Sequence, residues 1–370
     1  MSRNCPKSAL REYNNIQPTS YYGNDIDFKD AMSAKYNFDA TENNVFLEVY
    51  KTRGSADKGY TRHALHFSID GYSIAGESTC IVVSFGKNKP IFVFDIGCDI
   101  SKKLINNFMN QNLAGFFISH AHIDHIGGLP KIMLNLFNRR YNKKPNEMIP
   151  PVPIYVPSSY TIKHVDFPEC KEEISSIIDS VRSLQGASKT GNASVFQGIY
   201  NTFGLDGNDD KTYPTIVQKS KNDAFMIKRF KTCHTAPSQG YLIYEKTKTQ
   251  SSETYEPIVA FTGDTEIGFL NLKENAGIIN DVLRAPVLIM EMTYIKADHE
   301  PNAAAYGHMH LDHFINDFDR FNNERIIFIH LSRRCGSATE IVSLLNTKLD
   351  PLKEKMKKKN MDIQPLLVGF

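Results

Sequence analysis

Short apolar or alternating runs recur along the chain, and Gly, Pro or polar residues bound each of them. Runs of this length and composition are typical of β-strands. The pattern predicts strands over residues 79–85, 90–96, 114–119, 152–156, 225–231, 240–244, 258–262, 287–291, 325–330 and 364–368.

Longer segments with apolar residues at helical spacing lie between several of these strands. They predict helices over residues 101–110, 129–138, 171–184, 311–322 and 337–347, with Ser101 as the N-cap of the first. Strands and helices alternate along the chain, and the strands outnumber the helices. This balance favours an α/β protein in which two sheets pack together and helices flank them.

Two segments lack a clear period. Residues 1–60 are polar and predict an irregular N-terminal extension, which leaves residues 61–370 as the folded domain. Residues 185–222 are rich in Gly, Ser, Asn and Asp, and they predict a mobile insertion within that domain.

The net charge and the cysteines limit which partners and which cellular compartment we expect for the protein. The formal net charge is +2, so a site for a polyanion has to be a local patch. No apolar segment has the length of a membrane span, and the N-terminus has no signal-peptide pattern. The cysteines show no C-x-x-C spacing, so we expect free thiols in a reducing intracellular compartment, the cytoplasm or the nucleus. They are Cys5, Cys80, Cys98, Cys170, Cys233 and Cys335.

The densest group of metal-binding residue types follows the strand predicted at 114–119, where residues 119–128 read S-H-A-H-I-D-H-I-G-G. His120 and His122 are two residues apart and can project to the same side of an extended chain. Asp124 and His125 lie beyond the next bend and can face a second metal ion. Imidazole and carboxylate are the ligands that zinc takes where a position must stay open for water. The segment therefore predicts part of a two-metal site.

Further ligands have to come from other strand ends. His234 follows the predicted strand 225–231, Asp264 follows 258–262, and His330 ends 325–330. A carboxylate at Asp264 could bridge two ions, because it has one oxygen for each. Each residue alone could be a core histidine or a turn aspartate, but together with the 119–128 segment they predict one shared site.

Several motifs, taken together, resemble ribonuclease Z, the tRNA 3′-end endonuclease of the metallo-β-lactamase superfamily, in its short plant-type form. They are G-Y-S-I-A-G-E-S-T-C (71–80), F-D-I-G (94–97), the 119–130 segment, S-Q-G-Y (238–241), F-T-G-D-T (261–265), E-M-T-Y (291–294), Y-G-H (306–308) and I-H-L-S-R-R (329–334). The resemblance covers roughly residues 70–135 and 225–335. It implies the αββα sandwich of two mixed sheets flanked by helices.

The resemblance also implies a cofactor, two Zn²⁺ ions per chain, with Mn²⁺ or another divalent ion as a possible substitute. One ion would be held by three histidines, the other by Asp124 and two histidines, and Asp264 would bridge them. The histidines are His120, His122 and His234 for the first ion, and His125 and His330 for the second.

The catalytic roles follow from the same resemblance. The metal ions would activate a water for attack on phosphorus, and Asp124 would orient it. His308 would protonate the leaving 3′-oxygen, and Glu291 would hold the tautomer of His308 and raise its pKa. Asp95 would fix the metal-binding loop from behind. The implied partners are RNA, as precursor tRNA, and a second copy of the chain in a homodimer.

Other functions on the same fold stay open at this point. A small-molecule hydrolase, such as a β-lactamase or lactonase, could use the same ligands, although it would not require the pair of Glu291 and His308. A non-catalytic RNA-binding relative would be expected to lose metal ligands, yet the whole predicted set is present. A redox di-iron protein would use a carboxylate where this chain has His122.

Some features depart from the family pattern or invite a second interpretation. Only residues 246–257 separate two predicted strands where bacterial members carry a tRNA-gripping arm, so the arm is absent or replaced by the lysine-containing 185–222 segment. The lysine-rich stretch 353–359 could contact phosphates, or it could be a solvated helix end. Residues 308–313 repeat H-x-H-x-D-H, but we expect His310 and His313 to be polar surface groups rather than metal ligands.

Overall fold

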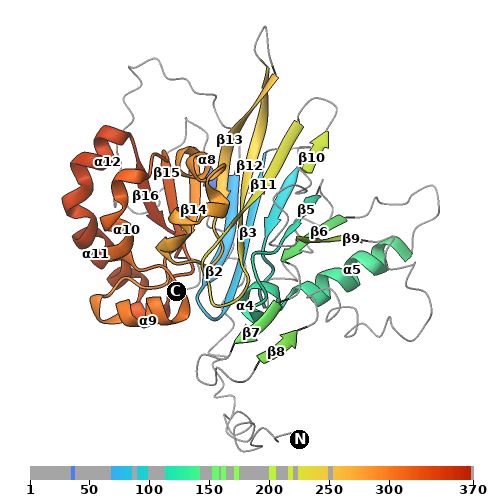
Figure 1. Ribbon diagram of the computed structural model, residues 1–370, viewed down its shortest axis with the longest axis horizontal. Coiled ribbons are helices and arrows are strands. Elements are labelled where there is room, and N and C mark those ends of the chain that lie inside the picture. Colours follow the sequence, from blue (N-terminus) through green and yellow to red (C-terminus); the bar gives the residue numbers. More distant parts are fainter. Residues whose placement is uncertain are drawn as a thin grey trace, which may run out of the picture.

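A seven-stranded mixed sheet forms one half of the computed structural model (Figure 1). The structure describes residues 35–37, 68–85, 90–98, 113–141, 152–157, 160–163, 171–174, 200–205, 216–219, 224–248 and 253–367. Neighbouring strands from β1 to β4 are antiparallel, whereas those from β4 to β9 are parallel. In spatial order the strands are β1 (Lys35–Asn37), β2 (Ser68–Ile74), β3 (Ser78–Ser84), β4 (Ile91–Phe94), β5 (Leu113–Phe117), β6 (Val152–Pro157) and β9 (Tyr200–Leu205).

The second half is another seven-stranded mixed sheet, in which the order of the strands follows the sequence. Strands β10 to β13 are antiparallel, and β13 to β16 are parallel. They are β10 (Ile216–Lys219), β11 (Ala224–Lys231), β12 (Gln239–Lys248), β13 (Glu253–Phe261), β14 (Val287–Glu291), β15 (Arg325–Ile329) and β16 (Asp362–Pro365). A separate hairpin pairs β7 (Tyr160–Lys163) with β8 (Lys171–Ile174).

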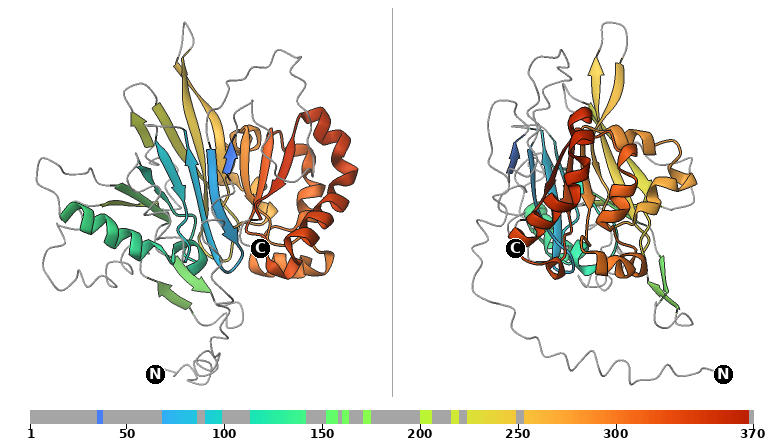
Figure 2. Two further views of the ribbon diagram at one scale, coloured as in Figure 1. Left: turned by 180° about the vertical axis from the view of Figure 1, so that it is seen from behind. Right: turned by 90° about the vertical axis from the view of Figure 1, so that its left-hand side faces the viewer.

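Helices lie on the outer sides of the two sheets. The C-terminal helices α9 to α12 gather at one end of the molecule, and α5 lies at the other end beside β6 and β9 (Figure 2). The α-helices are α4 (Ile123–Ile126), α5 (Leu129–Tyr141), α8 (Ile279–Arg284), α9 (Glu300–Tyr306), α10 (Leu311–Asn316), α11 (Ala338–Leu349) and α12 (Lys353–Lys359). Short 3₁₀ helices are η3 (Ile267–Asn271), η4 (Lys273–Asn275), η5 (Ala297–His299), η6 (Phe318–Arg320), η7 (Arg333–Cys335) and η8 (Asp350–Leu352).

Three apolar clusters join these layers. Between the sheets, the Phe94 and Phe261 rings stack with their centroids 4.9 Å apart. Ile132 and its neighbours on α5 pack against the outer face of the first sheet. On the outer face of the second sheet, Phe314 of α10 meets Phe328 of β15. Burying each such side chain contributes about 1.5–3 kcal/mol, so these clusters hold the four layers together.

The predicted α/β sandwich of two mixed sheets flanked by helices is confirmed. The strand predicted at 287–291 has the predicted limits, and the helix predicted over 337–347 is α11, whose N-cap is Ser337. The helix predicted over 311–322 is shorter, because α10 ends at Asn316 and η6 follows it. The helix predicted over 101–110, with its N-cap Ser101, lies outside the described residues.

In other segments the predicted kind of secondary structure was wrong. Residues 171–174, expected to begin a helix, form β8, because pairing with β7 overrides the local helical preference of Lys-Glu-Glu. The 185–222 segment is not wholly irregular, since β9 pairs with β6 and β10 pairs with β11. Within residues 1–60, the short strand β1 pairs with β2. The rest of both segments lies outside the described residues, so the domain limits stay a prediction.

The 246–257 segment is mostly strand rather than a connecting loop. Strands β12 and β13 continue past their predicted ends and form a long hairpin, which projects beyond the rest of the sheet (Figure 1). Cross-strand pairs such as Lys246 with Tyr255 and Thr247 with Thr254 extend the ladder.

The helices and cysteines of the described residues give two further observations. None of these helices combines the length and the apolar character that a membrane span requires. Among the described residues, Cys80, Cys98, Cys233 and Cys335 form no disulfide, as the cysteine spacing predicted. Cys5 and Cys170 lie outside the described residues.

Candidate metal centre

The predicted ligands meet at one edge of the sandwich, where strands of both sheets end. The segment with His120 to His125 follows β5, and His234 follows β11. Asp264 and His330 follow β13 and β15, which are both parallel to β14. Strand β11 runs in the same direction as β13, because each is antiparallel to β12. Strands that run in the same direction end at the same edge of their sheet, so the residues that follow them lie close together although they are distant in sequence.

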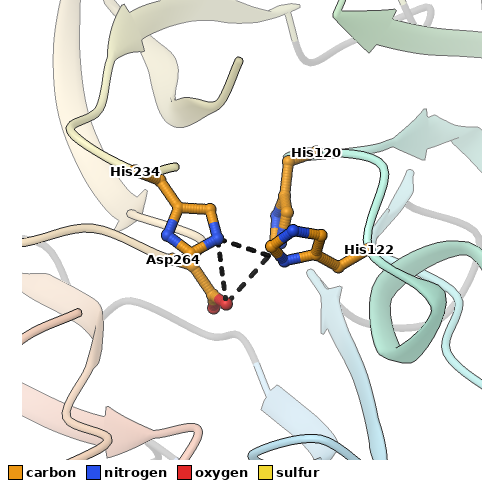
Figure 3. Close-up of side chains that lie close together, drawn as sticks. All are labelled: His120, His122, His234 and Asp264. Carbon is orange, nitrogen blue, oxygen red and sulfur yellow. Dashed lines mark hydrogen bonds and ion pairs between the residues drawn. The ribbon is translucent and has the colours of Figure 1, made fainter. Parts of the chain in front are cut away.

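One group contains His120, His122, His234 and Asp264, whose ligand atoms lie within 4.8 Å of one another (Figure 3). The Nε2 atom of His234 lies 3.1 Å from Nδ1 of His122 and 3.9 Å from Oδ2 of Asp264. The Nε2 atom of His120 lies 3.6 Å from the same carboxylate oxygen. The imidazoles therefore converge on one side of Asp264.

The second group contains Asp124, His125 and His330. Oδ2 of Asp124 lies 3.2 Å from Nε2 of His330 and 3.6 Å from Nε2 of His125. Asp264 also reaches this group, with Oδ2 3.5 Å from His330 Nε2 and Oδ1 3.4 Å from His125 Nε2. Its carboxylate thus lies between the two groups, in the position that a bridging ligand needs.

Three buried polar atoms between the two groups indicate whether metal ions fit the site. Within the part of the chain that the structure describes, the Nε2 atoms of His120 and His125 and the Oδ1 atom of Asp264 have no hydrogen-bond partner. A buried polar atom without a partner costs about 1–3 kcal/mol, and such atoms are rare in folded proteins. Imidazole nitrogens and carboxylate oxygens are ligands of divalent cations such as zinc. The residues present therefore fit a pair of such ions.

Asp95 holds the metal-binding loop from behind. Its Oδ2 atom lies 2.8 Å from Nδ1 of His125, and the Ser119 backbone N–H donates to Oδ1 over 2.6 Å. A hydrogen bond at Nδ1 leaves Nε2 of His125 facing the site. Burial raises the pKa of Asp95, although His125 and Ser119 act in the opposite direction. Asp95 therefore lies where the predicted loop-fixing residue should be.

Glu291 and His308 form a pair next to the ligands. Oε1 of Glu291 lies 3.2 Å from Nδ1 of His308. The backbone N–H groups of Thr265, Thr293 and Met309 also donate to this carboxylate, which is fully buried. Burial alone would lower the pKa of His308, but Glu291 and, to a smaller extent, Asp264 together outweigh it and raise the pKa to about 9. The predicted pair is thus brought together, with a proton stabilised on the imidazole.

The second H-x-H-x-D-H segment does not form a second centre. Among the described residues, no group of possible metal ligands includes His310 or His313. His310 was predicted at the surface, but it is buried as the N-cap of α10, where it accepts from the Asp312 backbone N–H. His313 lies 3.2 Å from Glu300 in an ion pair. A capping role explains the burial, because a helix N-terminus needs acceptors for its free N–H groups.

Comparison with known proteins decides the family. Over 295 residues the chain is 30% identical to tRNase Z TRZ1 of Arabidopsis thaliana. The aligned region covers 72% of this chain and 86% of that relative. The chain belongs to the ribonuclease Z family. A second relative of this ribonuclease Z is the chloroplastic tRNase Z TRZ2 of the same plant, 28% identical over 320 residues, 78% of this chain and 75% of the relative.

Three other likenesses of this ribonuclease Z are weaker. The family model of the anti-Pycsar protein Apyc1 matches residues 77–160, less than half of the chain. Human tRNase Z, short form, has a TM-score of 0.47 and 18% identity, covering 71% of this chain and 91% of that structure. The metallo-β-lactamase fold protein YhfI of Bacillus subtilis has a TM-score of 0.47 and 15% identity, covering 80% of this chain and 95% of that structure.

Sequence reasoning missed three residues that contact the site of this ribonuclease Z. The hydroxyl of Thr293 contacts Glu291 and lies 2.8 Å from Nδ1 of His330. The Ser119 hydroxyl donates to Asp95, and the Gly76 backbone N–H donates to Asp124. All three lie within the motifs quoted from the sequence, so their place inside a motif was the signal that could have indicated a contact with the site.

Proposed function

We propose that the protein is a metal-dependent endoribonuclease, a hydrolase that cleaves RNA phosphodiester bonds and processes the 3′ ends of precursor tRNA. The observation that carries this proposal is the Glu291–His308 pair beside the ligands of the two proposed ions. His308 also forms a third group of possible ligands with Asp264 and His330, but its Nδ1 atom lies 3.2 Å from Glu291. Such a pair supplies a positioned proton donor next to a site suited to divalent ions. Membership of a family whose relatives are named tRNase Z supports the choice of RNA.

The metal ions would be two Zn²⁺ per chain, or Mn²⁺ or another divalent ion. His120, His122 and His234 would hold one, and Asp124, His125 and His330 the other, with Asp264 shared. When bound, such ions lower the pKa of water and offset the charge of a phosphodiester.

The protein's own side chains would position the reactants and move one proton. Nδ1 of His308 lies at Glu291, so its Nε2–H is free to face the substrate. As the P–O bond breaks, this N–H would donate its proton to the leaving 3′-oxygen. Oδ2 of Asp124 lies 3.2 Å from Nε2 of His330 and accepts from the Gly76 backbone N–H, so this oxygen would face the second ion and Oδ1 would accept a hydrogen bond from the attacking water.

A small-molecule hydrolase is the second candidate, because the same ligand groups suit β-lactam or lactone opening. The pair of Glu291 and His308 favours the nuclease, since opening an amide or ester at a two-metal site does not require this proton relay. Slow cleavage of β-lactams as a side activity is compatible with the proposal.

The proposal is tested by offering three substrates to the metal-loaded protein: a 3′-extended precursor tRNA, an unstructured RNA and a chromogenic β-lactam. We expect cleavage of the precursor tRNA at its 3′ end, and loss of that activity in Asp264→Asn. Turnover of the β-lactam together with intact precursor tRNA would overturn the nuclease assignment in favour of the second candidate.

We propose that lysines of the 185–222 segment help to hold RNA. Lys189, Lys211 and Lys221 lie outside the described residues, while Lys219 ends β10. Since β9 and β10 are edge strands of the two sheets, deleting the segment would damage the fold. Changing the three lysines to Gln should instead raise KM for precursor tRNA and flatten its salt dependence, with bis-p-nitrophenyl phosphate turnover unchanged. An unchanged KM and salt slope would remove this role.

We also propose that two copies of the chain form a homodimer, as expected from the family. Sedimentation equilibrium should give twice the chain mass at micromolar concentration. A monomer mass across the concentration range would contradict this assembly.

A further inference from the structure

The turn between β2 and β3 contacts two ligands of the second metal group. The Gly76 backbone N–H donates to Oδ2 of Asp124 over 3.0 Å. Earlier in the same segment, the Ser73 hydroxyl accepts from the His330 backbone N–H over 2.9 Å. The Ala75 N–H donates to the Leu331 carbonyl, which ties the turn to the residue after His330. The turn therefore sets the positions of Asp124 and His330 together.

An ion pair at the protein surface also connects the β2–β3 turn with the segment after His330. Nε of Arg333 lies 2.5 Å from Oε1 of Glu77, and a second guanidinium nitrogen lies 3.4 Å from Oε2. The Tyr72 hydroxyl donates to the same carboxylate over 3.1 Å. Glu77 belongs to the turn and Arg333 follows His330 by three residues, so the pair spans the two segments that carry or support the ligands.

The backbone at both segments needs such support. Gly76 has a φ of 72°, and a Cβ built there would meet nothing within 4 Å among the described residues, so no side chain packs against Gly76 itself. His330 has a φ of 58°, a left-handed conformation that costs a non-glycine residue free energy unless the surroundings hold it. A bidentate ion pair between the two segments supplies that restraint.

We propose that Glu77 and Arg333 are positioning residues for the metal ion of the second ligand group. Their ion pair clamps the β2–β3 turn onto the segment after β15 and thereby fixes Asp124 and His330. Within the described residues, no hydrogen bond or ion pair connects this turn with His120, His122 or His234. The clamp therefore acts on one of the two metal ions, and the inference rests on the two-ion site of the proposed function.

The expected effect is modest and selective. The Glu77 and Arg333 side chains are 41% and 45% exposed, and exposed ion pairs are weak. Groups that orient a metal ligand directly change affinity by about 10- to 100-fold, and this pair acts one step further away. We expect loss of the pair to raise the Kd of one ion about three- to tenfold, and that of the other less than about twofold.

Stepwise binding of Zn²⁺ to the metal-free full chain, followed by calorimetry, tests the clamp. The variants are Glu77→Gln, Arg333→Met, the neutral double variant with both changes, and a charge exchange that combines Glu77→Arg with Arg333→Glu. The matched control is Arg284→Met, which breaks the ion pair of a half-exposed arginine with Asp281 on α8. Both single variants and the neutral double variant should weaken one ion, the exchange should recover affinity to within about twofold, and the control should bind as the wild type.

Four results would count against the clamp or against the site beneath it. Recovery in the neutral double variant would mean that net charge near Asp124 matters rather than the clamp, and would overturn the proposal. Equal weakening of both ions, with a lower urea midpoint, would mean that the pair only supports the fold. Unchanged binding in every variant would also overturn it. A wild-type chain that binds fewer than two ions would instead refute the two-ion site of the proposed function.

Discussion

Two residues at the metal centre have a backbone conformation that side chains rarely adopt. Asp95 has a φ of 56° and His330 a φ of 58°. The left-handed region costs a non-glycine residue about 1–2 kcal/mol, so both residues are held there by their surroundings. Asp95 is fixed by its bonds to Ser119 and His125, and His330 by Ser73 and Thr293. In the proposed site, strain at these positions would be part of how the ligands are aimed.

Replacement of Asp95 tests this arrangement. In Asp95→Asn, one oxygen becomes an amide N–H group that faces donors from Ser119, which leaves buried groups unpaired. We expect a loss of about 2–4 kcal/mol in the free energy of unfolding and an affinity for Zn²⁺ that is about 10- to 100-fold weaker. Urea unfolding and metal titration measure both, with the exposed Asp319→Asn as a control that changes neither.

Replacement of His308 tests the proton donor. His308→Ala should slow precursor tRNA cleavage by about 10²- to 10⁴-fold, because a general acid contributes that much. Metal content should stay at the wild-type value, and the effect should shrink on bis-p-nitrophenyl phosphate, whose leaving group needs no protonation. His313→Ala is the control, since His313 pairs with Glu300 away from the ligand groups. Loss of metal along with the side chain would make His308 a ligand instead.

At the scale of elements, burial decides what the sequence could reveal. β14 is buried along its whole length, and its apolar run, which ends in Glu291, predicted its limits correctly. β1, β8 and β10 are short and contain at least as many polar as apolar residues, and β1 and β10 are edge strands, so their apolar pattern is weak. Pairing with a distant partner makes them strands, and a local pattern does not contain that information.

The same limit applies to the metal centre. His234, Asp264 and His330 could be predicted because each follows a recognisable strand. The contact of Glu77 with Arg333 joins residues 256 apart in sequence, and neither belongs to a known pattern of metal ligands. Supporting contacts of this kind depend on tertiary structure, and they stay hidden until two sheets are placed against each other.

The capping box of α11 gives a prediction at this scale. The Ser337 hydroxyl accepts from the Glu340 backbone N–H, and the Glu340 side chain accepts from Ser337 in return. Ser337→Ala should lower the free energy of unfolding by about 1 kcal/mol, because the helix N-terminus loses an acceptor. Urea unfolding measures the loss. Metal affinity should not change, and a variant that also bound zinc poorly would show that α11 supports the site.

For the whole molecule, metal binding and folding should be coupled. The proposed ligands come from loops of both sheets, so the unfolded chain does not present them together. An ion that binds only the folded state stabilises it by about 2.7 kcal/mol when its free concentration is about 100 times its Kd. Chelation should therefore lower the Tm by several degrees, and calorimetry with and without zinc measures the shift. Asp264→Asn should show little difference between the two conditions, and an equal shift in that variant would place the stabilising ions elsewhere.

The distribution of the ligands along the chain also sets an order of events during synthesis. The ribosome releases the segment with His120 to His125 early, and His330 emerges only after β15 has been made. Until then the early histidines have no partner in the second sheet, and a nascent chain can hold metal only weakly. In the proposed two-ion site, loading of both ions would therefore come only after His330 has emerged, and a transcript cut short before His330 would yield a product without a complete centre.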